Sequence, residues 1–373
     1  MTIIGVPKEI KNHEYRVGMV PSSVAEVVQR GHKVIVQKNA GAGIGCSDQD
    51  YIDAGAVIEA EAAAIFAKAD MIVKVKEPQS NECAMLRENQ LLFTYLHLAP
   101  DPEQTKALLK SGCVAIAYET VTDARGKLPL LAPMSEVAGR LSIQMGARFL
   151  EKAQGGRGVL MGGVPGVAPA DVMIIGAGVV GTNALMMAVG MGARVTVIDR
   201  SLPRLRELDV IYGSKINTRP ASQSIIDGCL VNSDVIVTGA LVVGGSAPKL
   251  IKRSILSKMR KGSVIVDVSI DQGGCCETSK ATTHQDPVYV VDDVVHYCVA
   301  NMPGAVPRTS AFALNNATLP FTVALADKGY QKALLEDSHL LEGLNVYKGK
   351  LTYQAVSEAL DLPFTPAKEA LKS

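Results

Sequence analysis

The chain has 373 residues, and at about 150 residues per domain this length predicts two or three domains. Its 38 Lys and Arg residues nearly balance its 37 Asp and Glu residues, so no overall field attracts nucleic acid or an anionic membrane, and a small-molecule partner is favoured. Hydrophobic residues make up 47% of the chain, but no apolar run reaches the ~18 residues that span a bilayer.

The N-terminal sequence and the cysteines bear on the compartment. MTIIGVPKEIK lacks a basic segment followed by an apolar one, so we expect a cytoplasmic protein rather than a secreted one. The seven cysteines are an odd number with no C-x-x-C spacing, and we expect reduced, mostly buried thiols. The sequence has no close His and Cys cluster of the kind that binds zinc, so no metal is predicted.

Short β-branched segments alternate with helical ones from the start of the chain, which is the pattern of βαβ units in a parallel sheet. The strand segments of the first block are TIIGV, HKVIVQ, DMIVKVKE, QLLFTYLHL and GCVAIAYE. After a Gly-rich interval at 155–167, a second block contains DVMIIGAG, RVTVID, DVIVTG and SVIVDVSI. We therefore predict an α/β fold of two Rossmann-like, doubly wound domains with a cleft between them.

Two helical stretches define how the blocks are joined. Residues 135–152 predict one long connecting helix with Ser135 as its N-cap. Pro and Gly residues in CVANMPGAVPR, at 298–308, end the second block. The helical stretch 311–335 that follows is too short to fold alone. We expect it to pack back on one of the blocks, which makes the first domain discontinuous.

The segment Gly176-Ala-Gly178-Val-Val-Gly181 matches the G-x-G-x-x-G pattern in a fitting context, because a strand precedes it and a helix follows. These glycines would allow a tight turn and bring a pyrophosphate to the helix N-terminus. The next strand ends on Asp199, which would bind the adenosine ribose and repel the 2′-phosphate of NADP. The pattern favours NAD, although Arg200 could soften the preference. The alternative is that Asp199 is only a turn residue.

Polar residues follow several strands of the first block, namely Lys76, His97 and Glu119. Because parallel strands end at the same edge of a sheet, these residues predict a site there. Lys74 shares a strand face with Lys76, and the pattern does not choose between them. Arg16 follows the first strand and could bind a carboxylate through two hydrogen bonds.

In the second block, Asp271 follows the strand SVIVDVSI and precedes two glycines that would let the backbone bend against a ligand. We expect it to project toward the cleft. Taken singly, each of these polar residues could instead be a surface charge, a core histidine or a turn residue. Their joint placement predicts a catalytic site.

Many segments also match a known family in order and spacing. They are VPKEIKNHEYRVG, RGHKV, KVKEP, FTYLHLA, AYETV, LPLLAPMSEVAGR, GGRGVLMGGVPGV, IGAGVVG, VDVSIDQGG, YCVANMPGAVP and NATLP. Over essentially its full length the chain resembles the L-alanine dehydrogenase family. The related domain of proton-translocating transhydrogenase shares the fold but not the full catalytic set, so the presence of Arg16, Lys76, His97 and Asp271 favours the enzyme.

The resemblance implies an NAD-binding domain at 131–306 and a substrate domain formed by 1–130 and 307–373. It implies reversible oxidative deamination of L-alanine to pyruvate and ammonium with reduction of NAD to NADH, in amino-acid catabolism, by a hexamer. Two other functions remain open at this point. One is a non-catalytic, transhydrogenase-like nucleotide-binding module, and the other is a related amino-acid dehydrogenase of the lysine pathway.

The resemblance also implies residue roles. Arg16 would hold the substrate carboxylate, Lys76 would contact the keto oxygen or the carboxylate, His97 would be the acid/base group, and Asp271 would be the second catalytic residue. The implied NAD-binding positions are Ser135, Gly176, Gly178, Val179, Val180, Gly181, Asp199, Arg204, Ala240, Leu241, Val268, Asp271, Lys280, Asn301 and Met302. The chain departs from the family at Ala221, where a Ser near the adenine is common.

Overall fold

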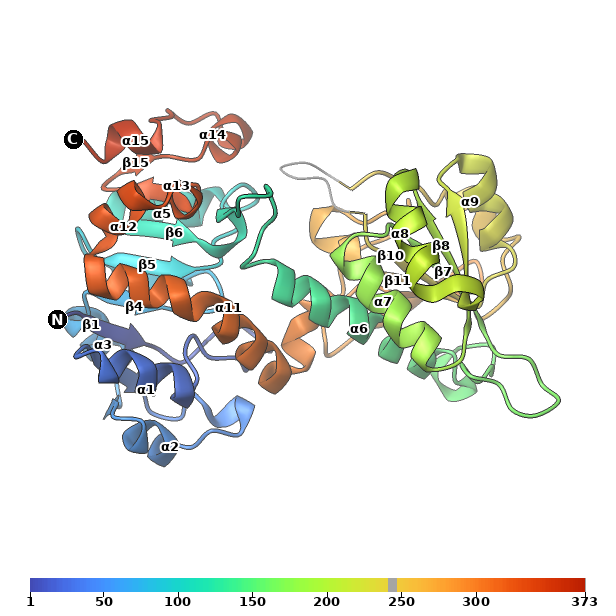
Figure 1. Ribbon diagram of the computed structural model, residues 1–373, viewed down its shortest axis with the longest axis horizontal. Coiled ribbons are helices and arrows are strands. Elements are labelled where there is room, and N and C mark those ends of the chain that lie inside the picture. Colours follow the sequence, from blue (N-terminus) through green and yellow to red (C-terminus); the bar gives the residue numbers. More distant parts are fainter. Residues whose placement is uncertain (241–246, 373) are drawn as a thin grey trace. The chain divides into compact units, whose positions relative to one another are not determined.

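The computed structural model describes residues 1–240 and 247–372 of the chain. The chain divides into two compact units, residues 1–134 with 306–373 and residues 135–305 (Figure 1). Each unit has its own mostly parallel sheet with helices packed against it. The predicted α/β fold, with two such domains and a discontinuous first one, is confirmed.

The sheet of the first unit has the strand order β15-β14-β6-β5-β4-β1-β2-β3 and is parallel from β6 through β3. β14 runs antiparallel to both β6 and β15. All residues of β5 and β6 are buried, as expected for central strands with both faces covered. The strands are β1 (Ile3–Val6), β2 (Lys33–Gln37), β3 (Val57–Glu59), β4 (Met71–Val73), β5 (Leu91–Thr94), β6 (Val114–Ala117), β14 (Leu344–Tyr347) and β15 (Lys350–Leu351).

Local sequence signals set the helices of this unit, as α5 shows. Its N-cap Asp101 accepts a hydrogen bond from the Gln104 N–H, Pro102 follows, and Gly112 ends the helix in the left-handed conformation. The predicted helix at 311–335 forms α11 and α12, divided at Gly329, and lies in the first unit as part of the discontinuous domain. The helices are α1 (Pro21–Gln29), α2 (Asp48–Asp53), α3 (Ala62–Lys68), α4 (Ser80–Cys83), α5 (Pro102–Ser111), α11 (Pro307–Lys328), α12 (Tyr330–Glu336), α13 (Ser338–Leu341), α14 (Gln354–Leu360) and α15 (Ala367–Ala370).

The connecting helix α6 spans Ala132–Phe149, so the prediction that Ser135 is its N-cap is wrong. The helix starts earlier because Pro133 fits in a first turn, where its missing N–H is not needed. The N–H groups of Leu131 and Ala132 both donate to the Leu128 carbonyl and lead the chain into the helix. Ser135 therefore lies inside α6.

The sheet of the second unit has the order β12-β13-β11-β10-β7-β8-β9, and it is parallel except for β12. Helices α7 and α8 lie on one face of it in Figure 1. The strands are β7 (Asp171–Ile175), β8 (Arg194–Asp199), β9 (Ile216–Pro220), β10 (Val235–Thr238), β11 (Val264–Asp267), β12 (Val288–Val291) and β13 (Val294–Tyr297). The helices are α7 (Val179–Gly190), α8 (Leu202–Tyr212), α9 (Gln223–Leu230) and α10 (Arg253–Leu256).

The strand predicted at 263–270 is shorter in the structure. It ends at the fully buried Asp267, and a 3-10 helix, η5 (Val268–Gln272), follows. The Asp267 carboxylate accepts hydrogen bonds from Thr238 Oγ1 at 2.6 Å, from the Cys275 N–H at 2.7 Å and from Ser279 Oγ at 2.6 Å. These bonds hold the segment from Cys275 to Ser279 against the end of β11. Asp271 is consequently an exposed residue of η5 and not the end of a strand.

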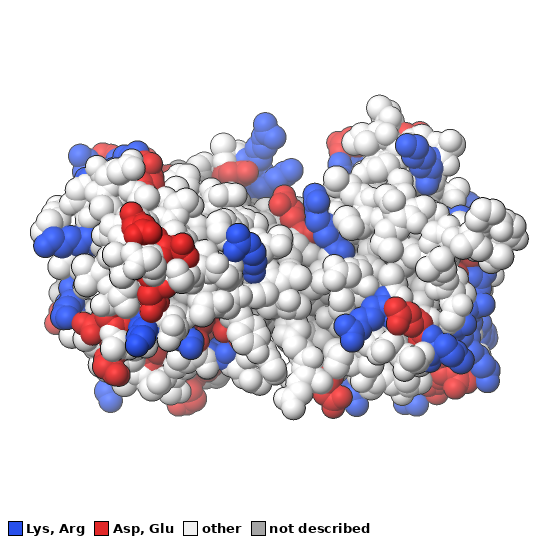
Figure 2. All heavy atoms as spheres, turned by 90° about the horizontal axis from the view of Figure 1, so that it is seen from below, with Lys and Arg blue, Asp and Glu red and all other residues white. Residues whose placement is uncertain are grey.

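The surface and the thiols agree with the sequence expectations. On the face shown in Figure 2, Lys and Arg side chains lie among Asp and Glu side chains. Within the described ranges, no helix has the length and apolar character needed to cross a membrane. The seven cysteines are free, and all but Cys229 are buried, as predicted.

Candidate functional site

The predicted glycine pattern forms the turn between β7 and α7. Gly176 has a φ of +97°, and a Cβ on Gly181 would lie 1.7 Å from the Gly176 carbonyl oxygen, so both positions require glycine. Gly178 is the N-cap of α7. Apart from its chain neighbours, no described atom lies within 4 Å of the position that a Cβ on Gly178 would occupy. The start of α7 is thus open at Gly178. This arrangement fits the pyrophosphate of a dinucleotide.

Asp199 ends β8 beside this turn. Its carboxylate accepts a hydrogen bond from the Ala177 N–H at 2.6 Å and another from the Ser201 N–H at 2.7 Å. Each carboxylate oxygen can accept a further bond, so ribose hydroxyls can be bound here. Arg204 donates from Nε to the Ala177 carbonyl at 3.0 Å and from Nη2 to Thr182 Oγ1 at 2.8 Å. Asp199 and Arg204 therefore both hydrogen-bond to the backbone of Ala177 in this turn.

Helix α6 also reaches this turn. A Cβ on Gly139 would lie 2.2 Å from the Val180 carbonyl oxygen, so the two helices approach closely at this glycine. Ser135 lies one turn earlier on α6 and is partly buried. Val179, the first residue of α7, is 42% exposed. The structure thus places Val179 and Val180 at the turn and Ser135 on the helix beside it.

The segment that follows β10 also lies beside the glycine turn, at Ala240. A Cβ on Gly176 would lie 3.3 Å from the Ala240 backbone nitrogen. The Ala240 carbonyl accepts a hydrogen bond from Ser269 Oγ at 2.9 Å, which joins it to η5 and so to Val268. Leu241, also predicted to bind the nucleotide, lies outside the described residues.

Three further predicted nucleotide residues have other surroundings. Lys280 Nζ lies 4.5 Å from the centre of the Tyr289 ring. Asn301 has a φ of +63°, and its carbonyl accepts a hydrogen bond from His284 Nε2 at 3.1 Å. Met302 is buried at the start of a short 3-10 helix. These contacts do not join the three residues to the glycine turn, and their role stays a prediction.

In the first unit, Arg16 is 2% exposed and is held by Glu14. Glu14 Oε1 accepts from Arg16 Nε at 2.6 Å, and Oε2 accepts from Nη2 at 2.5 Å. Burial acts to lower the pKa of Arg16, but the hydrogen bonds and charge of Glu14 outweigh it and hold this pKa above its ordinary value. On the Nη1–Nη2 edge, which a second carboxylate would have to use, Nη1 donates to Met134 Sδ at 3.1 Å. Sequence reasoning missed Glu14, although it stands two residues before Arg16.

The structure distinguishes Lys74 from Lys76. Lys74 is fully buried, and its Nζ donates to Glu9 Oε2 at 2.9 Å and to Glu82 Oε1 at 2.8 Å. Burial lowers the pKa of Lys74, but the two glutamates more than offset it, and this pKa lies above its ordinary value. Lys76 is partly buried, and its N–H and that of Val75 donate to Glu9 Oε1. Lys74 is therefore structural, and Lys76 remains the substrate candidate.

His97 lies three residues beyond β5, and its side chain is 44% exposed. The Tyr95 ring stacks on the imidazole, with 5.9 Å between centroids and 11° between planes. Tyr95 is buried and interacts electrostatically with Arg16. Glu119 follows β6 and accepts a hydrogen bond from the His97 N–H at 2.7 Å. Of the residues predicted at strand ends, His97 and Glu119 thus make direct contact.

Arg16, Lys76 and His97 lie on segments that leave β1, β4 and β5 at one edge of the first-unit sheet. These strands are neighbours, and β6, which precedes Glu119, continues the same row. The Lys76 carbonyl accepts a hydrogen bond from Thr94 Oγ1 at 3.0 Å, which ties the β4 and β5 ends together. Asp271 belongs to the second unit.

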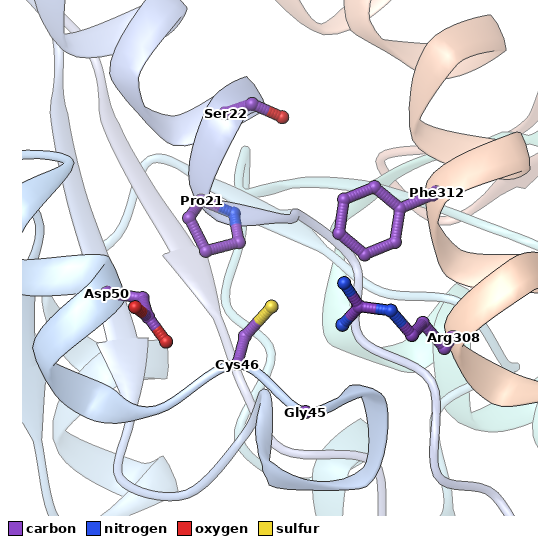
Figure 3. A pocket seen from close by; sticks show the side chains of 7 residues that line it. All are labelled: Pro21, Ser22, Gly45, Cys46, Asp50, Arg308 and Phe312. Atoms are coloured by element: carbon purple, nitrogen blue, oxygen red, sulfur yellow. The ribbon is translucent and has the colours of Figure 1, made fainter.

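A hollow of about 290 Å³ lies elsewhere in the first unit and is shown in Figure 3. Arg308 enters it, donates to the Ile44 carbonyl at 2.6 Å and lies 5.1 Å from the centre of the Phe312 ring. The hollow is lined by Pro21, Ser22, Gly45, Cys46, Asp50, Arg308 and Phe312. Since the predicted substrate and nucleotide residues are not among these, we assign the hollow no part in the reaction.

The sequence matches two models of one family. The N-terminal domain of alanine dehydrogenase/PNT matches residues 5–138, and the C-terminal domain of alanine dehydrogenase/PNT matches residues 142–354. The chain is 60% identical to an alanine dehydrogenase of Halomonas elongata, with 98% of each chain covered. It is 49% identical to an alanine dehydrogenase of Mycobacterium tuberculosis, with 99% of each chain covered.

Solved structures agree with these matches. The chain superposes on a solved L-alanine dehydrogenase with a TM-score of 0.94 and 51% identity, covering 96% of this chain and 99% of the other. A transhydrogenase from Sinorhizobium meliloti gives a TM-score of 0.81 at 23% identity over 95% of this chain and 99% of the other, which shows a shared fold. The chain therefore belongs to the alanine dehydrogenase/PNT family.

Proposed function

We propose that this protein is an NAD-dependent L-alanine dehydrogenase. The proposed reaction converts L-alanine, NAD and water into pyruvate, ammonium, NADH and a proton, and it is reversible. The observation that carries the proposal is the placement of Arg16, Lys76 and His97 at one sheet edge of a chain that matches alanine dehydrogenases over its length. In the second unit, the open space at the start of α7 and the Asp199 carboxylate support a dinucleotide.

The residues divide the work of this reaction. Nicotinamide, when bound, supplies the hydride acceptor, so that alanine becomes an iminium that water converts to pyruvate and ammonium. Arg16 binds the substrate carboxylate, and Lys76 stabilises negative charge on the substrate oxygen. His97 moves the protons, because one imidazole nitrogen can accept a proton and later donate it. Asp271 is the second catalytic residue, which positions water or ammonia.

The nucleotide site is assigned to the second unit, with NAD preferred over NADP because of Asp199. Its proposed residues are Ser135, Gly176, Gly178, Val179, Val180, Gly181, Asp199, Arg204, Ala240, Leu241, Val268, Asp271, Lys280, Asn301 and Met302. The resemblance to the family supports a cytoplasmic hexamer acting in amino-acid catabolism. Size-exclusion chromatography with light scattering measures the oligomer directly.

The proposed function is tested by following NADH formation, through its absorbance, with a series of amino acids. With NAD present, L-alanine, glycine, L-serine and L-lysine are offered separately, and we expect L-alanine to give the highest kcat/KM. A preference for L-lysine would instead support an enzyme of the lysine pathway. NADH formation from none of the four amino acids would support a nucleotide-binding module without dehydrogenase activity.

Asp199→Gly is expected to raise kcat/KM for NADP relative to NAD by about 10–100-fold. The change removes a hydrogen bond to the ribose and the charge that repels a 2′-phosphate. Steady-state kinetics with both nucleotides measure the ratio. Asp199→Asn is the companion variant, because it removes the charge and keeps an oxygen for the Ala177 N–H, while its amide nitrogen replaces the oxygen that accepts from the Ser201 N–H. If the ratio of kcat/KM for NADP to that for NAD is unchanged in both variants, Asp199 does not determine the nucleotide preference.

Arg16→Lys is expected to raise the KM for pyruvate by about 10–100-fold and to leave the KM for NADH unchanged. Lysine keeps a positive charge beside the buried Glu14 but lacks the planar fork that binds a carboxylate through two bonds. Arg16→Ala is expected to show the same pattern with a larger rise. Wild-type pyruvate kinetics in both variants would exclude Arg16 from the substrate site.

A further inference from the structure

His97 has an unusual backbone conformation. Its φ of +50° lies in the left-handed region, which only a few per cent of non-glycine residues adopt, mostly asparagine, aspartate and histidine. Such a conformation persists only where the surrounding structure imposes it. At His97 this conformation is held by a neighbouring carboxylate, which accepts hydrogen bonds from the backbone N–H groups of His97 and of the residue before it.

That carboxylate belongs to Glu119, in the short 3-10 helix that follows β6. Glu119 Oε1 accepts hydrogen bonds from the His97 N–H at 2.7 Å and from the Leu96 N–H at 3.1 Å, and Oε2 lies 3.3 Å from the same Leu96 nitrogen. The Glu119 side chain is only 16% exposed. Hydrogen bonds to a carboxylate are about twice as strong as bonds between neutral groups, so Glu119 holds these two backbone N–H groups strongly.

The imidazole is constrained on two sides. Its face stacks on the Tyr95 ring, whose hydroxyl is anchored by donating to the Leu130 carbonyl at 2.6 Å. Its Nδ1 lies 3.9 Å from Glu119 Oε1, which is an electrostatic contact rather than a hydrogen bond. With Nδ1 turned toward Glu119, Nε2 is the ring nitrogen that can meet a substrate.

We propose that Glu119 is a positioning residue for the reaction. Its carboxylate holds the backbone of His97 in the left-handed conformation and so aims Nε2 of the imidazole at the substrate. The inference rests on the proposed function, since it takes His97 as the acid/base group. In this role Glu119 acts through the backbone of His97.

A double-mutant cycle with Glu119→Ala and His97→Asn tests this positioning. Glu119→Ala alone is expected to lower kcat by about 10–100-fold with the KM for NADH unchanged, because small displacements of a catalytic group cost this much. In the His97→Asn background, Glu119→Ala should lower kcat by less than about twofold. Equal losses of activity in both backgrounds would overturn the proposal, since they would mean that Glu119 acts independently of His97.

Two companion variants separate positioning from folding. Glu119→Gln keeps an oxygen for the backbone N–H groups and is expected to recover most of the kcat lost in Glu119→Ala. Glu103→Ala removes an exposed glutamate of the same unit and should leave kcat unchanged. Loss of kcat in Glu119→Gln equal to that in Glu119→Ala would contradict a role through the backbone.

Hydrogen exchange gives a readout that does not depend on the substrate. Glu119→Ala should speed exchange of the Leu96 and His97 amides, while Glu119→Gln should preserve their protection. Absence of L-alanine oxidation by the wild-type protein would refute the proposed function, whereas unaltered exchange in Glu119→Ala would refute the positioning itself.

Discussion

His97→Asn should lower kcat for both directions of the reaction by about 10²–10⁴-fold while NADH still binds. The factor is that of a lost general acid/base group. Asparagine is the suitable replacement because it tolerates the left-handed conformation of this position and carries no group that titrates near neutrality. Stopped-flow or steady-state assays give kcat, and NADH fluorescence titration gives the dissociation constant.

The control for His97→Asn is His339→Ala, which removes a partly buried histidine of the same unit that hydrogen-bonds Thr122. We expect it to keep kcat near the wild-type value. His97→Ala should repeat the loss seen in His97→Asn. Turnover near that of the wild type in both His97 variants would remove His97 from the catalytic role and leave the site without an acid/base group.

Lys74→Ala should reduce the free energy of unfolding by about 3–5 kcal/mol. The change leaves the carboxylates of Glu9 and Glu82, each 2% exposed in its side chain, without the cation that pairs with both. Breaking a buried pair from one side is costly because the remaining charge cannot be solvated. Urea unfolding followed by circular dichroism measures the change, since the chain contains no tryptophan.

Lys106→Ala is the matched control for Lys74→Ala. Lys106 pairs with Glu103 on the exposed face of α5, and its loss should cost no more than about 1 kcal/mol. A variant with Lys74→Met, Glu9→Gln and Glu82→Gln should regain part of the stability, because it removes all three charges together. A Lys74→Ala protein as stable as Lys106→Ala would show that the buried charges do not depend on each other.

The elements that sequence predicted well are those fixed by short-range patterns. The glycine turn and its flanking strand and helix were predictable because Gly176 and Gly181 are required by local geometry and Asp199 stands at a set distance after them. The return of α11 to the first unit followed from its length, since such a helix has no core of its own. The fold class, with its discontinuous first domain, therefore follows from the sequence.

The features that sequence missed depend on contacts between distant residues. The strand after Ser263 ends at Asp267 because that carboxylate binds backbone and hydroxyl groups up to twelve residues later, which periodicity does not reveal. The choice between Lys74 and Lys76 required Glu9, which is 65 residues from Lys74. The start of α6 at Ala132 has a local cause, because Pro133 fits in the first turn of a helix.

The reaction is tested most directly by its stoichiometry, with NADH, pyruvate and ammonium measured together after incubation with L-alanine and NAD. We expect the three products in equal amounts, and none of them when D-alanine replaces L-alanine. NADH formed without matching ammonium and pyruvate, or no NADH from L-alanine at all, would contradict the assignment of this protein as an L-alanine dehydrogenase.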